Sequence, residues 1–278
     1  MVNITAAEVN KLRQITGAGI MDCKQALKES EGDLEKAIEY LRKKGQKVAN
    51  KRADRDANEG IVLAQVANGN NFGAMIMVNC ETDFVGKNQD FTDFAKSILE
   101  LAIKEKPNTI DELNALTLNG VTVADRIMEM TGKTGEKIGL NHYEVISAPI
   151  VFTYNHHGNR LSSMAGFSKA DVKEIESFGH DIVMQIAAMS PIAIDKDDVS
   201  QEVVAKEIEI GKDIAIQEGK PAELAEKIAM GKLGKFFKDN TLLNQDFIKE
   251  SNITVKEYLA RFDKELKITA IKRLMLGA

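Results

Sequence analysis

The sequence has little proline and no long apolar run. Only 4 of its 278 residues are Pro, and 44% are hydrophobic against 28% charged, which excludes a disordered chain and favours a helix-rich folded one. No apolar stretch approaches the roughly 20 residues that a membrane-spanning helix needs. The first residues, MVNITAAEVNKLRQ, lack the basic start and apolar stretch of a secretory leader. We therefore expect a cytoplasmic protein with no membrane partner.

Cysteine and histidine are also scarce. The two cysteines, Cys23 and Cys80, stand far apart and outside any C-x-x-C spacing, which excludes a disulfide framework and a zinc knuckle. We expect both to be small buried apolar residues. The four histidines are His142, His156, His157 and His180. Of these, His180 alone has a potential co-ligand at helical spacing, Glu176, and one such pair does not complete a zinc site. No metal site is expected.

The usual signatures of catalysis are missing too. There is no G-x-S-x-G motif and no serine or cysteine with a local base. The stretch TGKTGEK at 131–137 ends like a phosphate-binding loop, but the position that needs the upstream glycine holds Ile127. We interpret it as the end of a helix. The sequence therefore predicts neither an active site nor a bound nucleotide or other cofactor.

The charge balance bears on nucleic-acid binding. A formal net charge of −5 argues against a dedicated nucleic-acid binder, because neutralising phosphates requires a basic face. One basic run does occur, made of Lys43, Lys44, Lys47, Lys51, Arg52 and Arg55. It has no interleaved aromatic residues for base stacking, and Asp54 and Asp56 dilute it. We interpret the run as a solvated linker.

The N-terminal residues 1–46 predict three short helices. Thr5 and Asp33 are expected N-caps, TGAG at 16–19 separates the first two helices, and Gly45 is expected to end the third. The apolar residues at helical spacing are Val9, Leu12, Ile15, Met21, Ala26, Leu27, Leu34, Ala37, Ile38 and Leu41. Residues 47–59 are polar without an apolar period, so they predict a linker.

From residue 60 the periodicity changes to that of strands. GIVLAQVA and FGAMIMVNC, joined by the turn NGNN, predict a β-hairpin. An amphipathic helix follows, with its apolar face made of Phe91, Phe94, Ala95, Ile98, Leu99 and Ala102. Helices near 109–117 and 122–131 then precede a strand, IGLNHYEVISA.

The same theme occurs a second time. APIVFTYNHHGNRLSSMAGF predicts another hairpin, DVKEIESFGHDIVMQIAAM another amphipathic helix, and ITAIKRLMLGA a strand that joins the second hairpin. We therefore predict an α+β fold with two related core subdomains, at 60–140 and at 141–190 with 238–278.

Residues 198–237, within a predicted hairpin unit at 191–237, are helical and rich in charge, with one break at EGKP, where Gly219 and Pro221 signal a sharp turn. They predict an antiparallel helical hairpin that protrudes from the core, because its charged faces need little cover. The hairpin is compatible with pairing to a second copy as a homodimer, with packing on another protein, or with standing free.

Two segments allow a functional interpretation. In LRQITGAGIMDCKQAL, at 12–27, a tight turn places Ile20 and Met21 at a helix corner; packing explains most of the pattern but does not require both to point inward. In NCETDFVGKNQDF, Phe84 is in helical phase with Phe91. One interpretation therefore makes Phe84 a core residue and Asp83 an N-cap, and the other makes the pair a tool aimed at another molecule. The residues alone slightly favour the first.

These two segments, LRQITGAGIMDCKQAL and VNCETDFVGK at 78–87, resemble the two signature stretches of the elongation factor Ts family almost position by position. The resemblance extends over nearly the whole chain. It implies an N-terminal module like a ubiquitin-associated domain, and a guanine nucleotide exchange factor for the GTPase elongation factor Tu. Such a factor has no active site of its own.

The resemblance also implies which residues touch the partner. Thr82, Asp83, Phe84 and Val85 would enter the nucleotide-binding domain near its magnesium site and displace the magnesium. Arg13, Gly17, Ile20 and Met21 of the N-terminal module would dock on the same domain. His156 would face another domain of the GTPase, although the neighbouring His157 makes that alignment ambiguous.

Two alternatives come from other classes. The three-helix module and basic run could belong to an adaptor of the ubiquitin-associated type or to an RNA-binding scaffold, whose binding would be insensitive to Asp83. An enzyme is the other alternative, and it would need catalysis without any of the arrangements considered above.

Overall fold

The computed structural model describes residues 4–277 and combines helices with antiparallel sheets, which confirms the α+β prediction. The helices are α1 (Ala6–Thr16), α2 (Ile20–Glu29), α3 (Leu34–Lys51), α4 (Asp83–Gly86), α5 (Gln89–Glu105), α6 (Ile110–Ala115), α7 (Val123–Thr134), α8 (Ile175–Met189), α9 (Gln201–Gln217), α10 (Ala222–Asn240) and α11 (Val255–Ala260). The strands are β1 (Glu59–Val66), β2 (Phe72–Cys80), β3 (Thr117–Leu118), β4 (Val121–Thr122), β5 (Gly139–Ser147), β6 (Ile150–Asn155), β7 (Leu161–Phe167), β8 (Asp246–Phe247), β9 (Glu250–Thr254) and β10 (Ile268–Met275). Short 3₁₀ turns lie at Lys196–Asp198 and Leu242–Asn244.

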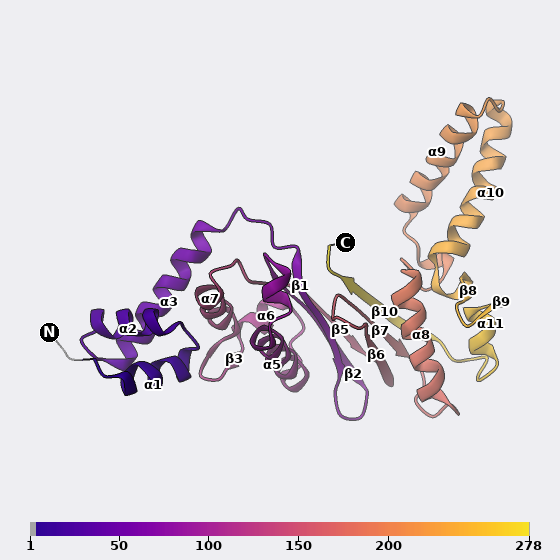
Figure 1. Cartoon of the computed structure of the whole chain (residues 1–278). Helices are drawn as coiled ribbons and strands as arrows, with labels where there is room; N and C mark the ends of the chain where they lie inside the picture. The colour runs from indigo at the N-terminus through magenta and orange to yellow at the C-terminus, as the bar shows by residue number, and fades with distance from the viewer. Residues whose placement is uncertain (1–3, 278) are drawn as a thin grey trace.

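Helices α1 to α3 form the N-terminal bundle (Figure 1). Thr5 and Asp33 cap their helices as predicted, since each side chain accepts a backbone N–H of the first turn. The buried side chains of the bundle are Val9, Leu12, Cys23, Ala26, Leu27 and Ala37. The prediction that Ile15 shares this face is wrong: it is 47% exposed, because the bundle buries α1 only at Val9 and Leu12.

Helix α3 does not end at Gly45, so that prediction is wrong. It continues to Lys51, which makes the first part of the predicted linker helical. Gly45 is instead where α3 crosses α7: a Cβ on it would lie 2.6 Å from the carbonyl oxygen of Met128, and one on Gly132 would lie 3.1 Å from the Cα of Gly45. The glycine pair lets two backbones touch, and this fixes the bundle against the rest of the protein.

The two main sheets share one topology. Strand order is β1-β2-β5 in the first and β6-β7-β10 in the second, and every neighbouring pair is antiparallel. In each sheet a hairpin comes first, helices follow, and a later strand returns to pair with the hairpin's second strand. The repeated hairpin-then-helix pattern and the pairing of the last strand with the second hairpin are thereby confirmed.

The sheets stack face to face, with helices outside both (Figure 1). Along β2 the side chains alternate: Met75 and Met77 enter the layer between the sheets, whereas Ile76 and Val78 enter the layer under α5. All residues of β2 are therefore buried, which explains why its sequence is apolar almost throughout. On the other side, α8 covers the second sheet with Phe178 and Ile182.

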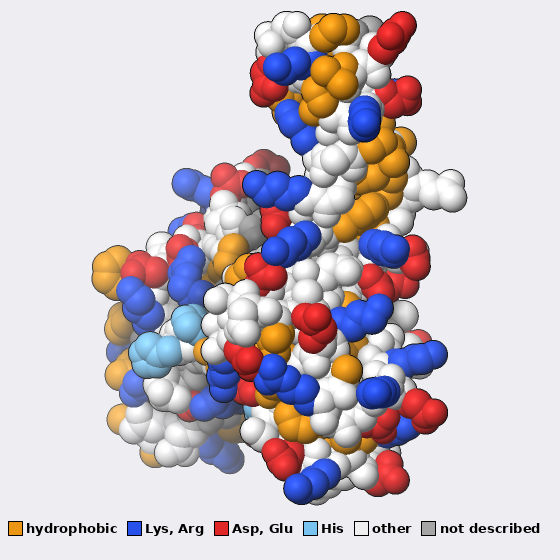
Figure 2. Space-filling view, turned by 90° about the vertical axis from the view of Figure 1, so that its right-hand side faces the viewer, with side chains coloured by type: hydrophobic (Ala, Val, Ile, Leu, Met, Phe, Trp, Pro, Cys, Tyr) orange, Lys and Arg blue, Asp and Glu red, His pale blue; other side chains and the backbone are white. Residues whose placement is uncertain are grey.

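Helices α9 and α10 form the predicted hairpin and project from the core (Figure 1). They pack on each other through small residues, Gly211 and Ala215 on α9 and Ala225 and Ala229 on α10. Figure 2 shows apolar side chains along the hairpin and at its tip, and the large exposed ones are Ile210, Ile214, Ile216, Leu224 and Met230. No helix within residues 4–277 is long and apolar enough to cross a membrane.

The α3–α7 crossing gives a stability prediction. Gly45→Ala should lower the free energy of unfolding by about 1–3 kcal/mol, because the new methyl group meets backbone that cannot move aside. Gly231→Ala is the matched control: it lies inside α10 with nothing within 4 Å, so it should stabilise by roughly 0.5–1 kcal/mol. Urea unfolding followed by circular dichroism measures both, and an unchanged Gly45→Ala midpoint would contradict the tight crossing.

Candidate functional site

The α4 segment, residues 82–86, follows directly where β2 leaves the sheet. Thr82 is its N-cap and accepts the backbone N–H of Val85. The N-cap prediction for Asp83 is therefore wrong, because Asp83 is the first helical residue. The core interpretation of Phe84 is wrong as well: at 84% it is the most exposed large hydrophobic side chain within residues 4–277. Val85, one position later, packs inward on the first core cluster.

Asp83 is held next to Phe84 by its own helix. Its carboxylate lies 2.6 Å from Lys87 Nζ, one turn later; the Lys87 side chain is 77% exposed and the Asp83 side chain 46%. The hydrogen bond from Lys87 and the positive charge of that residue lower the pKa of Asp83. The segment thus presents an ionised carboxylate and a bare aromatic ring side by side.

The base of the α4 segment is tied to the loop after α7. Glu136 Oε2 accepts the backbone N–H groups of Glu81 and Thr82 at 3.1 and 3.0 Å, and Glu136 Oε1 accepts the Thr82 hydroxyl at 2.6 Å. In return, Glu81 accepts the backbone N–H of Lys137 and the Arg52 guanidinium, both at 2.6 Å. Neither Glu81 nor Glu136 was predicted from the sequence. An acidic residue at a strand end or after a helix gives no local signal of such a contact.

The N-terminal corner, residues 17–21, also exposes apolar side chains. Gly17 ends α1 with a φ of +66° and donates its N–H to the carbonyl oxygen of Arg13. Met21 is 73% exposed and Ile20 is 52% exposed, so both point outward at the start of α2. Arg13 is exposed on the last turn of α1.

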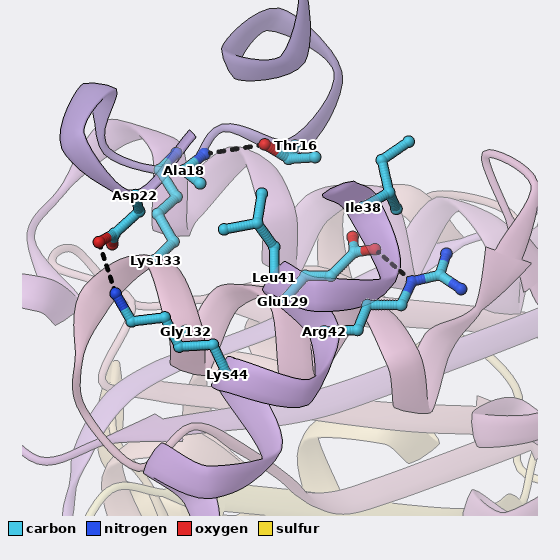
Figure 3. Close-up of a pocket in the computed structure, with 10 residues that line it drawn as sticks. All are labelled: Thr16, Ala18, Asp22, Ile38, Leu41, Arg42, Lys44, Glu129, Gly132 and Lys133. Carbon is cyan, nitrogen blue, oxygen red and sulfur yellow. Dashed lines mark hydrogen bonds and ion pairs between the residues drawn. The ribbon is translucent and has the colours of Figure 1, made fainter. Parts of the chain in front are cut away.

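Lys133 of α7 lies between the N-terminal corner and the start of α5. Lys133 Nζ lies 3.3 Å from where a Cβ on Gly17 would be, and 2.7 Å from Asp90 at the start of α5. Asp90 is only a few residues after α4. Figure 3 shows the seam between the bundle and α7, which two ion pairs flank: Arg42 with Glu129, and Lys44 with Asp22.

His156 lies on the exposed turn between β6 and β7, where its Nδ1 is 2.8 Å from the Tyr154 hydroxyl. Arg160, at the end of the same turn, pairs with Glu59. The pKa of Arg160 is raised, mainly by the hydrogen bond to Glu59 and to a smaller extent by the negative charge of Asp83. Glu59 is opposite Cys80 in the β1–β2 pair, just before α4, so the turn and the α4 segment lie at the same end of the core.

The structure also tests the predictions for the TGKTGEK stretch and for the two cysteines. TGKTGEK is the end of α7, with Gly135 in the left-handed conformation, so the helix-end interpretation is confirmed. Cys23 and Cys80 are buried, as expected, and burial raises the pKa of the Cys80 thiol to about 12. Within residues 4–277 no group of three or more His, Cys, Asp or Glu side chains could hold a metal ion.

Comparison with known proteins gives the family. The family model described as Elongation factor TS matches residues 81–278. A curated protein named Elongation factor Ts from Amoebophilus asiaticus is 50% identical over 275 residues, 99% of each chain. Proteins of the same name from Flavobacterium psychrophilum and Christiangramia forsetii are 49% and 48% identical over 100% of both chains. The chain belongs to the elongation factor Ts family.

Membership in the elongation factor Ts family makes this chain a translation elongation factor and confirms the resemblance seen at the two signature stretches. The family model begins its match at residue 81, inside the second stretch. The relatives that match along the full length show that the similarity to the elongation factor Ts family includes the N-terminal bundle.

The exposure of Phe84 predicts how stability responds to its removal. Phe84→Ala should change the free energy of unfolding by less than about 0.5 kcal/mol, because the ring is almost wholly in solvent. Phe91→Ala, which removes a ring that is 1% exposed, should cost about 3–5 kcal/mol. Thermal and urea unfolding of both variants checks this. A comparable loss of unfolding free energy in Phe84→Ala would mean that the Phe84 ring packs in the core.

The Asp83–Lys87 pair predicts how the Asp83 carboxyl group titrates. Because Lys87 lowers the folded-state pKa of Asp83, any stability from the pair is complete above the unfolded pKa and is lost as pH falls through the folded pKa. Lys87→Ala should raise the pKa of Asp83 toward its ordinary value. Carboxyl ¹³C NMR titration measures this, and an unmoved pKa would mean that the pair does not form in solution.

Proposed function

We propose that this protein is a guanine nucleotide exchange factor that binds elongation factor Tu in its GDP form and promotes GDP release. The observation that carries the proposal is the exposed Phe84 beside the ionised Asp83, on a helical turn whose N-cap Thr82 is bound by Glu136 and whose Val85 packs on the core. A bare ring on an anchored segment has no role in folding, and it suits insertion into another protein. We place this activity in the cytoplasm.

The mechanism is a coupling of two binding equilibria. A factor that binds the nucleotide-free GTPase more tightly than the GDP form must weaken GDP binding by the same ratio. Magnesium bridges the phosphates to the GTPase, so displacing the groups that support it removes a large part of the hold on GDP. Phe84 acts as the wedge between elements of the partner, and Asp83 reorganises polar contacts nearby. Thr82 caps the segment and Val85 anchors it to the core.

The N-terminal corner supplies a second contact on the same nucleotide-binding domain. Ile20 and Met21 are exposed at the corner whose Gly17 lies next to Lys133 of α7, and Lys133 pairs with Asp90 shortly after the α4 segment. Arg13 and Gly17 complete the corner. His156, on the β6–β7 turn, contacts another domain of the GTPase. Binding at several points gives a tighter hold than either apolar contact alone.

The RNA-binding alternative finds less support in the basic run. Lys43 pairs with Glu39, Lys44 with Asp22 and Arg52 with Glu81. These carboxylates offset the positive charge that phosphate binding would need. For the hairpin, the exposed apolar residues on α9 and α10 fit either the GTPase or a second copy in a homodimer.

The test is the release of a fluorescent GDP analogue from elongation factor Tu in excess unlabelled GDP. The wild type should accelerate release strongly. Asp83→Ala and Phe84→Ala should each lower kcat/KM by about tenfold or more, as expected for central interface residues. The double variant Ile20→Ala with Met21→Ala should mainly raise the half-saturating concentration, because it removes docking area away from the magnesium site.

Ile248→Ala is the matched control, since Ile248 is an exposed apolar residue outside both segments. Its kinetics should equal those of the wild type. Acceleration that survives both Asp83→Ala and Phe84→Ala would leave exchange intact but remove the α4 segment from it. No acceleration by the wild type would reject the proposed function in favour of the adaptor alternative.

A further inference from the structure

We propose that Glu136 is a positioning residue for the α4 segment: its carboxylate fixes the direction in which Phe84 and Asp83 project. The inference rests on the proposed exchange function and assigns a role to a residue outside both signature stretches. Glu136 lies two residues after the end of α7, far from Phe84 in the sequence.

The geometry gives Glu136 control over where α4 begins. It accepts three hydrogen bonds within two residues: the N–H groups of Glu81 and Thr82, and the Thr82 hydroxyl. The hydroxyl oxygen of Thr82 in turn accepts the N–H of Val85. One carboxylate thus orients the N-cap, and the N-cap orients the helical turn that carries Phe84.

A reciprocal contact stiffens this arrangement. Glu81 accepts the backbone N–H of Lys137, so the strand end and the loop after α7 bind each other in both directions. Arg52, just after α3, completes the Glu81 contact at 2.6 Å. The carboxylates of Glu81 and Glu136 lie close together here. Backbone amides, the Thr82 hydroxyl and the Arg52 guanidinium donate hydrogen bonds to their oxygens.

Helix α7 also bears the contacts of the N-terminal bundle, through Gly132 at the α3 crossing and Glu129 at Arg42. Helix α7 therefore contacts the bundle, and the loop that follows it contacts the α4 segment. Removing Glu136 should loosen the α4 segment without releasing the bundle, because the α3–α7 contacts lie earlier on the helix. A loosened segment must be ordered again on binding, which weakens the step that uses Phe84.

The experiment is a double-mutant cycle in the GDP-release assay. Glu136→Ala should lower kcat/KM about tenfold, an effect expected of a misplaced functional group, and Glu136→Gln should be intermediate because its amide oxygen still accepts. In a Phe84→Ala background, Glu136→Ala should have less than about a twofold effect, because the ring it positions is gone. A role in general stability would instead give additive losses and would overturn the proposal.

The matched control is Glu257→Ala. Glu257 accepts the backbone N–H and hydroxyl of Thr254 at the start of α11, the same chemistry at a place outside the proposed contacts. It should leave GDP release at the wild-type rate. A loss equal to that of Glu136→Ala would overturn the specific role of Glu136.

Hydrogen exchange gives a readout that does not depend on the GTPase. Glu136→Ala should speed exchange at the amides of Glu81, Thr82 and Val85, and leave the bundle amides unchanged. Unchanged protection of these three amides would overturn the positioning role of Glu136, even if the variant released GDP more slowly. Failure of the wild type to accelerate GDP release would instead overturn the proposed function, and with it this role, so the two failures are distinguishable.

Discussion

Val62, Met75 and Met164 meet between two three-stranded sheets, and the positions of the other elements follow from that contact. Each sheet also carries helices on its outer face, so the strands in the middle are buried on both sides. A strand buried on both faces cannot shift its register without moving apolar groups into the wrong layer. The point where β2 ends at Cys80 is consequently fixed, and the α4 segment starts from a rigid position.

Rigidity at this point matters because the segment presents a side chain that folding does not need. An exposed aromatic ring adds nothing to the core and favours unwanted association. Its neighbours are nonetheless strongly held: Val85 packs on the core, and Glu136 secures the N-cap. A local arrangement that sacrifices burial while keeping its support is typical of functional sites.

Helix α7 connects this site to the N-terminal bundle. Its glycine contact with α3 sets the distance between the two, and Lys133 links the Gly17 corner to the start of α5. The long hairpin at the other end of the molecule (Figure 1) is built differently. Its two helices bury small residues against each other and leave larger apolar side chains in solvent, so that it adds reach without adding to the core.

The sequence by itself determined the local structure. The caps at Thr5 and Asp33, the two predicted hairpins, the amphipathic helix from Phe91 and the repeated hairpin-then-helix order follow from rules that act within a few residues. The two signature stretches were also enough to indicate the family to which the chain belongs. The roles of Asp83 and Phe84 toward a partner stay predictions.

Only the tertiary structure decided which way several of these residues face. Helical spacing put Phe84 and Ile15 on apolar faces, but against the other elements of residues 4–277 Phe84 stays 84% exposed and Ile15 47% exposed. Gly45 has the appearance of a helix end, yet it is a crossing point because α7 arrives there. Glu136 reaches Thr82 across 54 positions of sequence. Periodicity describes the face of one element, whereas exposure and contact depend on which distant element covers it.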